Sequence, residues 1–346
     1  MKMTHFLPLI LCFGCANIVP LSGGDIDKTP PQLLAVCPKN ESILFEENKI
    51  KMVFDEAIQI NPTEKVFFSP YIHNEVKLDV RGKELSISIN DDLEENTTYT
   101  IILNNLVKDV TEGNVLANLD YTFSTGSSID TLYIEGVALD ALSKTPLENV
   151  CVGLFSSNTF EDSLLYKQVP EYLALSDKDG RFKFSNLPDK EFMLYALEDL
   201  DNNLKFTLPQ EKVGFLSKPL GANQQGLTVL LFDETAIADS LKNEPSDENT
   251  KFGRLIIDAL PNAPLIVELI QKESVVYRAS SSTSLTIDSL SAGTYSLRII
   301  YDDNQNETWD SGNLLNRQQA EVVNYHPKEI IIRADWDVIV EWETNE

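Results

Sequence analysis

Lys49-Ile50-Lys51-Met52-Val53-Phe54 carries large apolar side chains at every second position, namely Ile50, Met52 and Phe54. Alternation with a period of two is typical of a half-buried β-strand. The pattern returns at 84–89, 98–103 and 120–123, and turn clusters such as 81–83 separate the runs. Many short strands with regular turns predict an all-β chain of tandem β-sandwiches.

Composition sets the scale of the protein and argues against one class of partner. The 346 residues are enough for two or three domains, and an apolar content of 42% is enough for packed cores. The 54 acidic and 28 basic residues give a net charge of −26, which argues against nucleic acid because phosphates would not be neutralised. Helical periodicity is scarce, and 234–242 is the best short candidate.

The N-terminus carries an export signal. Lys2 precedes an apolar run at 6–13, and the small residue Gly14 precedes Cys15, as in a secretory signal peptide. A signal that ends at a cysteine resembles the lipobox of bacterial lipoproteins. The resemblance implies that 1–14 is removed and that Cys15 is acylated with palmitate-type chains. The alternatives are an ordinary cleaved signal, or an anchor at Cys12.

A lipid at Cys15 would give the protein its contact with the membrane. No other stretch approaches the roughly 20 apolar residues of a spanning helix, and residues 15–28 read as a lipidated tether. Ala16 follows the cysteine, whereas an aspartate there is the familiar signal for retention in the inner membrane. We therefore expect an outer-membrane location. The lack of acids at 16–20 leans toward the periplasmic face, but the cell-surface face stays open.

The first domain has a recognisable pattern. It comprises Thr29-Pro30-Pro31, the strand that ends Phe54-Asp55-Glu56, the segment 93–99 (Leu-Glu-Glu-Asn-Thr-Thr-Tyr) and the close Phe123-Ser124-Thr125-Gly126. Residues 29–126 thereby resemble a bacterial Ig-like domain of the S-layer-protein type. The family implies a structural or adhesive sandwich.

Residues 130–232 resemble a transthyretin-like domain of the carboxypeptidase-regulatory type. The resemblance rests on 134–138, on Pro146-Leu147 with a strand through 152, on the hairpin turn 176–182 and on Leu187-Pro188. Gly180 supplies the positive φ that such a turn needs. The two domains in this order behind a lipobox resemble a lipoprotein family of Bacteroidetes-type bacteria.

The third segment, 252–346, repeats part of the second at an offset of about 103 residues. Residues 187–194 align without gaps to 290–297, and Asp199, Asp201 and Asn203 fall on Asp302, Asn304 and Asn306. A second transthyretin-like sandwich is the economical explanation, with 233–251 as the linker.

One loop carries the pattern of a metal site. Asp302, Asn304, Asn306 and Asp310 place oxygen ligands at positions 1, 3, 5 and 9, which resembles an EF-hand calcium loop. Glu307 replaces the turn glycine and Asn313 replaces the bidentate glutamate. The alternative is a loop of Asx turns between two strands. Apart from this calcium, we expect no cofactor. The matching loop at Asp199 is the weaker calcium candidate.

Two kinds of covalent modification are also open. Cys37 and Cys151 remain after processing, and they either form a disulfide or stay as buried free thiols. Four tripeptides resemble the Asp-Ser/Thr-aliphatic O-glycosylation sites of Bacteroidetes. Their acceptors are Thr131, Ser163, Ser240 and Ser289.

These features predict a non-catalytic protein. Only His73 and His326 follow the signal, and neither lies in a recognisable nucleophile motif. We expect an outer-membrane lipoprotein that is a structural or interaction subunit of an envelope assembly, such as the machinery for outer-membrane protein assembly or transport, with other envelope proteins as partners. The alternative is a glycan- or surface-binding adhesin with Trp309 in its site.

Overall fold

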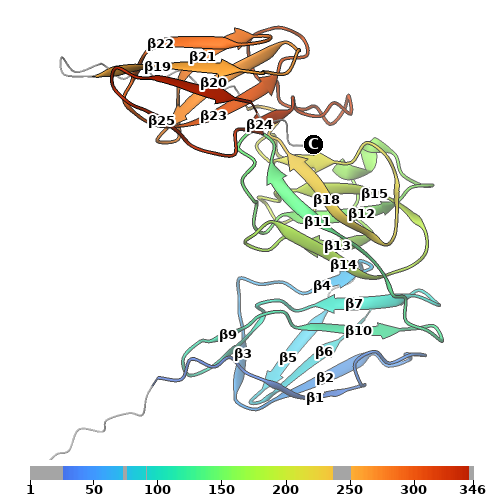
Figure 1. Ribbon diagram of the computed structural model, residues 1–346. Coiled ribbons are helices and arrows are strands. Elements are labelled where there is room, and N and C mark those ends of the chain that lie inside the picture. Colours follow the sequence, from blue (N-terminus) through green and yellow to red (C-terminus); the bar gives the residue numbers. More distant parts are fainter. Residues whose placement is uncertain (1–25, 73–75, 91, 237–250, 343–346) are drawn as a thin grey trace, which may run out of the picture.

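Three β-sandwiches lie in a row along the chain (Figure 1). The computed structural model describes residues 26–72, 76–90, 92–236 and 251–342. Nearly all regular elements there are strands, so the all-β prediction is confirmed. Within these residues no helix is long and apolar enough to cross a membrane.

The first sandwich packs a four-stranded sheet, ordered β1-β2-β6-β5, against a three-stranded sheet, ordered β10-β7-β4. A smaller sheet, β3-β8-β9, lies beside them. The strands are β1 (Leu33–Cys37), β2 (Lys49–Phe54), β3 (Ile58–Ile60), β4 (Phe67–Ser69), β5 (Lys77–Arg81), β6 (Glu84–Ser88), β7 (Thr98–Ile102), β8 (Val107–Asp109), β9 (Val115–Leu116) and β10 (Asp120–Ser124).

Strand β2 shows why the sequence folds this way. Ile50, Met52 and Phe54 are fully buried in the core, while Lys49 and Lys51 are exposed. Because successive side chains of a strand point to opposite faces, this alternation fixes which face of the sheet meets the core. The burial observed in β2 confirms the pattern read from the sequence.

The second sandwich combines the sheets β14-β11-β18 and β13-β12-β15-β16, and β17 also pairs with β15. Strand β11 pairs antiparallel with β14 and parallel with β18. Its elements are β11 (Leu132–Asp140), β12 (Cys151–Ser156), the short 3₁₀ helix η1 (Asp162–Tyr166), β13 (Tyr172–Leu175), β14 (Arg181–Leu187), β15 (Glu191–Leu197), β16 (Val213–Phe215), β17 (Leu220–Gly221) and β18 (Gln224–Leu231).

The third sandwich has the sheets β22-β19-β26 and β21-β20-β23-β24, and β25 also pairs with β23. Its strands are β19 (Phe252–Asp258), β20 (Leu265–Gln271), β21 (Ser274–Ser281), β22 (Leu285–Ser291), β23 (Gly293–Tyr301), β24 (Val323–Tyr325), β25 (Ile330–Ile332) and β26 (Asp337–Glu341).

The third sandwich has the same strand order as the second sandwich. Strands β11 to β18 correspond in sequence to strands β19 to β26. The registers of the two sandwiches also agree: residues that are paired across neighbouring strands in the second sandwich correspond to residues that are paired in the third. The matching pairs are Leu132–Leu187 with Gly253–Leu290, Leu154–Leu194 with Leu269–Leu297, and Leu197–Val213 with Ile300–Val323. The offset of 103 residues read from the sequence holds for β14 with β22 and for β15 with β23, whereas loops of different length change the offset for the other strands.

The first and second sandwiches contact each other at the edges of two sheets. The N–H of Tyr71, just after β4, donates to the carbonyl oxygen of Glu171, just before β13, at 2.6 Å. The hydroxyl of Ser69 accepts the N–H of Leu173 at 3.4 Å. These bonds join the edge of one sheet to the edge of the next.

The second and third sandwiches share a hydrophobic core. Met193, Tyr195 and Phe232 of the second sandwich belong to the same buried cluster as Ile266 and Ile300 of the third. Trp309, Leu314 and Ala320, from the loop between β23 and β24, complete this cluster. Such burial makes the two sandwiches one packed unit rather than two modules on a flexible linker.

Some expected boundaries differ from the observed ones. The strand expected over 146–152 begins only at Cys151, because 141–150 forms turns and Pro146 makes a single bridge to Leu139. Strand β18 ends at Leu231 and β19 begins at Phe252, on either side of the expected linker. Most of the helical candidate 234–242 lies outside the described residues.

Candidate functional site

The loop expected to bind calcium follows β23 and is a series of turns. The Asp302 carboxylate accepts the N–H groups of Asn306 at 3.1 Å and Glu307 at 2.9 Å. The side-chain amides of Asn304 and Asn306 both donate to one carboxylate oxygen of Asp310. The four predicted ligands are thus brought together, and their oxygens accept hydrogen bonds from the loop itself. This is the arrangement of Asx turns, and calcium binding here stays a prediction.

The matching loop after β15 has the same turns. The Asp199 carboxylate accepts the N–H groups of Asn203 at 3.1 Å and Leu204 at 2.9 Å. Here three carboxylates converge, because oxygens of Asp199, Asp201 and Glu211 lie within 4.8 Å of one another. Burial raises the pKa of Asp199, and the carboxylates of Asp201 and Glu211 raise it further. The cluster has the oxygen chemistry that a hard cation prefers.

Sequence reasoning missed the buried glutamate that organises each loop. Glu211 is fully buried and accepts the N–H groups of Leu200, Thr207 and Leu208 at 3.0–3.2 Å. Glu321 accepts those of Asp303 and Asp310, each at 3.0 Å. The two glutamates are 110 residues apart, the same separation as the paired Val213 and Val323. An alignment of the two repeats that continued as far as β16 and β24 would have matched Glu211 with Glu321.

The disulfide alternative is wrong in this structure. Cys37 is an exposed free thiol on β1 of the first sandwich, and Cys151 is a buried free thiol on β12 of the second. The alternative of buried free thiols is therefore right for Cys151 and wrong for Cys37, which is exposed. Burial raises the pKa of the Cys151 thiol to about 12, so this group is protonated and unreactive at neutral pH.

The candidate glycosylation sites differ in access. Thr131 and Ser289 are exposed, and Ser163 is half-buried in η1. Ser240 lies outside the described residues, as do Cys15, the signal 1–14 and most of the tether. Only an exposed hydroxyl can accept a glycan on the folded protein. Glycosylation at Thr131 and Ser289 is therefore compatible with the fold.

The three tryptophans fall into two groups. Trp309 and Trp342 are 5% and 6% exposed and belong to hydrophobic cores. Trp336 is 62% exposed and directly precedes β26. Trp309 is therefore not available to stack on a sugar ring, whereas Trp336 is exposed at the surface of the third sandwich.

A cleft of about 920 Å³ separates the first two sandwiches. Phe67, Ile102 and Asp120 line it from the first sandwich. Charged residues of both signs, Glu135, Arg181 and Lys183, line it from the second. Its volume is within the range of ligand sites, but its mixed lining selects no single class of ligand.

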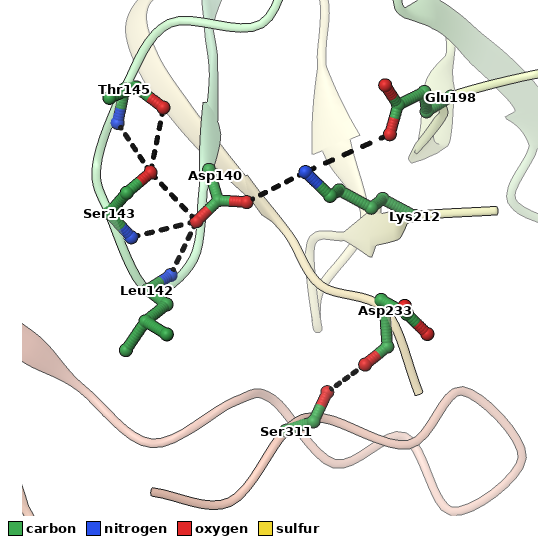
Figure 2. A network of polar contacts seen from close by, with 8 residues as sticks. All are labelled: Asp140, Leu142, Ser143, Thr145, Glu198, Lys212, Asp233 and Ser311. Atoms are coloured by element: carbon green, nitrogen blue, oxygen red, sulfur yellow. Dashed lines mark hydrogen bonds and ion pairs between the residues drawn. The ribbon is translucent and has the colours of Figure 1, made fainter. Parts of the chain in front are cut away.

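Polar contacts lie within the second sandwich and across its junction with the third (Figure 2). One carboxylate oxygen of Asp140 accepts the N–H groups of Leu142 at 3.0 Å and Ser143 at 2.8 Å, and the other lies 3.0 Å from Lys212 Nζ. The Ser311 hydroxyl of the third sandwich donates to the Asp233 carbonyl oxygen of the second at 2.6 Å.

The loop between β23 and β24 makes further contacts across this junction. The N–H of Leu314 donates to Glu234 at 2.6 Å, and the Gln319 amide donates to the carbonyl oxygen of Phe215 at 2.9 Å. At Gly312, an added Cβ would lie 2.4 Å from the Phe232 ring, so the backbone packs directly on that ring. The β23–β24 loop is thus the candidate calcium loop, and it also holds the second and third sandwiches together.

Comparison with protein families bears on the first sandwich. Residues 27–125 match a family described as a bacterial Ig-like domain. The resemblance inferred from the Thr-Pro-Pro start and the Phe-Ser-Thr-Gly close is thereby confirmed for this domain. The transthyretin-like assignment of the following sandwiches stays a prediction. No curated protein matches the chain.

Solved structures resemble the chain only distantly. A minor pilin of Streptococcus agalactiae shares 16% identity, covers 61% of this chain and 94% of its own length, and has a TM-score of 0.20. Two proteins of Bacteroides uniformis follow. One is titled a putative carbohydrate binding protein (8% identity, 58% of this chain and 99% of that one, TM-score 0.21), and the other a DUF3823 family protein (9%, 59% and 100%, 0.22). At such scores these neighbours support no argument about function.

Proposed function

We propose that the chain is a non-catalytic lipoprotein of the outer membrane that acts as a rigid interaction subunit of an envelope assembly. The observation that carries the proposal is the continuous packing of the sandwiches. A shared core joins the second and third, and hydrogen bonds between sheet edges join the first and second. A chain built in this way holds its surfaces at fixed positions relative to one another, which is what a scaffold requires.

The polar groups of the described residues support the same proposal. The buried acids Glu211 and Glu321 are occupied by backbone N–H groups of their own loops. His326 Nδ1 lies 2.8 Å from the carbonyl oxygen of Lys328, and His73 lies outside the described residues. These roles are structural, whereas a catalytic acid or base needs access to a substrate.

The lipid anchor is tested by fractionating cells that express variants of the full chain. We expect the wild-type protein and Cys12→Ala in the outer-membrane fraction, and we expect Cys15→Ala to lose its attachment. Several acyl chains anchor stably because each buried CH₂ contributes about 0.8 kcal/mol. Equal membrane attachment of both cysteine variants would refute an anchor at Cys15. Protease treatment of intact cells decides between the periplasmic and the cell-surface face.

The assembly itself is tested by mild detergent extraction and co-purification. A subunit of an assembly is recovered with the same envelope proteins in repeated preparations, and the yield of these proteins falls with Cys15→Ala. Recovery of the protein alone under gentle conditions would contradict the proposal.

A glycan- or surface-binding adhesin is the second candidate, and the exposed Trp336 favours it. Sugar rings stack on accessible aromatic faces, and Trp336 provides one where Trp309 does not. Glycan-array binding that is lost with Trp336→Ala and kept with Trp309→Phe would support this function.

A further inference from the structure

One face of the third sandwich exposes large apolar side chains. Ile339 is 64% exposed and Phe252 is 40% exposed, and Trp336, which is 62% exposed, directly precedes β26. Ile339 is opposite Ile256 in the pairing of β26 with β19, and the N–H of Arg254 donates to the carbonyl oxygen of Trp336 at 3.0 Å. We call Phe252, Ile256, Trp336 and Ile339 the Trp336 face.

The fold does not need this apolar surface. Because Leu132 matches Gly253 in the repeat, Thr131 and Glu135 of the second sandwich stand where the third has Phe252 and Ile256. The same framework therefore folds with polar residues at these positions. Burying side chains of this size yields free energy only when something covers them.

The equivalent face of the second sandwich already opposes a neighbouring domain. Its residues Glu135 and Lys183 line the cleft across from Phe67 and Ile102 of the first sandwich. One copy of the repeat thus presents this sheet face to another module. In the third sandwich the same face is exposed and more apolar, as expected for a surface that meets a separate partner.

Strand β26 adds backbone groups to the surface. It pairs with β19 on one side, and among the described residues no strand pairs with its other side. An edge strand offers a row of N–H and C=O groups to which an extended segment can add as a new strand. Figure 1 shows this sheet at the end of the row that is farthest from the first sandwich.

Charge indicates the kind of segment that fits. Asp335, Asp337 and Glu341 lie on or next to β26. Arg254 is already engaged by Asp288 at 2.6 Å and by Asp337 at 3.6 Å. Arg333 is also exposed, and its guanidinium lies 6.0 Å from the centroid of the Trp336 ring. Asp288, Asp335, Asp337 and Glu341 outnumber Arg254 and Arg333, so the edge has an excess of acidic groups, which attracts basic side chains and repels acidic ones.

A second copy of the chain fits the edge poorly. Antiparallel pairing of two β26 strands about Ile339 would place Asp337 opposite Glu341, and like charges directly opposite each other are destabilising. Each chain also carries a net charge of −26, so two copies repel each other.

We propose that β26 and the Trp336 face bind an extended, basic segment of a partner protein, which joins the sheet β22-β19-β26 as a fourth strand. This inference deepens the proposed function, on which it rests, because it names the class of partner.

The test uses the full chain purified in detergent and two synthetic nine-residue probes, one alternating Lys with Val and one alternating Glu with Val. We expect the basic probe to slow hydrogen exchange of the backbone amides of 337–341 about tenfold when most of the protein has bound the probe. The basic probe should also shield Trp336 from acrylamide quenching. The quenching reports mainly on Trp336, because Trp309 and Trp342 are buried and contribute little. The acidic probe should produce neither effect.

Matched variants locate the site. Ile339→Lys should reduce the affinity for the basic probe about tenfold through repulsion and lost apolar contact. Leu315→Lys makes the same change at an exposed leucine of the β23–β24 loop and should leave the affinity unchanged. Circular dichroism and the unfolding temperature of both variants confirm that they are folded.

Several results would overturn the proposal. They are equal binding of the two probes, no protection of β26 by the basic probe, or undiminished binding by Ile339→Lys. Dimers that disappear with Ile339→Lys would assign the face to a second copy, and glycan binding that disappears with Trp336→Ala would assign it to a sugar. The probe assay does not depend on acylation, so an unlipidated Cys15 would end the proposed function without changing this result.

Discussion

At the scale of single residues, Gly180 links the sequence to the fold most directly. It lies in the turn between β13 and β14 with φ of +74°, in the left-handed region expected from the sequence. An added Cβ would also lie 2.6 Å from the carbonyl oxygen of Ala138, which is closer than real Cβ contacts. The position therefore requires glycine for two independent reasons.

Gly180→Ala should destabilise the second sandwich by about 3 kcal/mol, from the left-handed backbone and the clash together. Gly82→Ala is the matched control, because Gly82 has φ of +61° but no atom within 4 Å of its added Cβ. The control should cost only about 1 kcal/mol. Denaturant unfolding measures both values, and equal losses would show that the contact with Ala138 is unimportant.

Asp140 gives the stability of the second sandwich a dependence on pH. Burial alone would raise its pKa, but hydrogen bonds from Ser143 and the ion pair with Lys212 outweigh burial and lower the pKa below 3.8. A carboxylate with a lowered folded pKa stabilises the fold above its unfolded pKa. This stabilisation is lost as the pH falls from about 4 through the folded pKa.

Asp140→Asn should therefore lower the stability at neutral pH by about 1 kcal/mol and flatten the loss of stability below pH of about 4. Asp179→Asn removes an exposed carboxylate 3.6 Å from Arg181 and should change little. Thermal unfolding between neutral and acid pH compares the two variants with the wild-type protein. An unchanged acid profile in Asp140→Asn would show that Asp140 does not contribute to the loss of stability in acid.

At the scale of elements, strands were easier to predict than the contacts between them. The alternation of Ile50, Met52 and Phe54 determines β2 on its own, because burial follows the period of the strand. Helix η1 gave no signal, because its five residues are too few for a helical period. The acid that supports the Asp302 loop, Glu321, lies 19 positions downstream, and no local motif connects the two.

Calcium binding by the β23–β24 loop remains a prediction of the sequence. We expect about 1 mM calcium, the range of weak extracellular sites, to raise the unfolding temperature and magnesium not to do so. The variant Asn304→Ala with Asn306→Ala should lose the response, while Asp201→Ala, which alters the matching loop after β15, should keep it. A response lost only with Asp201→Ala would transfer the site to the Asp199, Asp201 and Glu211 cluster. The absence of any response would contradict calcium binding.

At the scale of the whole molecule, the shared core between the second and third sandwiches was not predictable from sequence. The repeat revealed that two similar sandwiches exist, but it carried no information about how they meet. Phe232 and Trp309 both belong to apolar patterns that could equally fill a core within one domain. The expected linker 233–251 gave no sign that residues on both sides of it pack together.

Phe232→Ala should cost about 3 to 5 kcal/mol and separate the unfolding of the second and third sandwiches. Phe45→Ala, the same change in the core of the first sandwich, should leave the second and third unfolding together. Calorimetry follows the transitions, and small-angle scattering reports whether the row of sandwiches bends. A single unchanged transition for these two sandwiches in Phe232→Ala would show that the shared core does not couple them.

The intact mass of the native protein extracted from membranes shows whether Cys15 is acylated. A rigid row of sandwiches can serve an envelope assembly in the proposed way only if its N-terminus is held at the bilayer. We expect a polypeptide that begins at Cys15 and carries the added mass of acyl chains. A chain with an unacylated N-terminus would contradict this expectation.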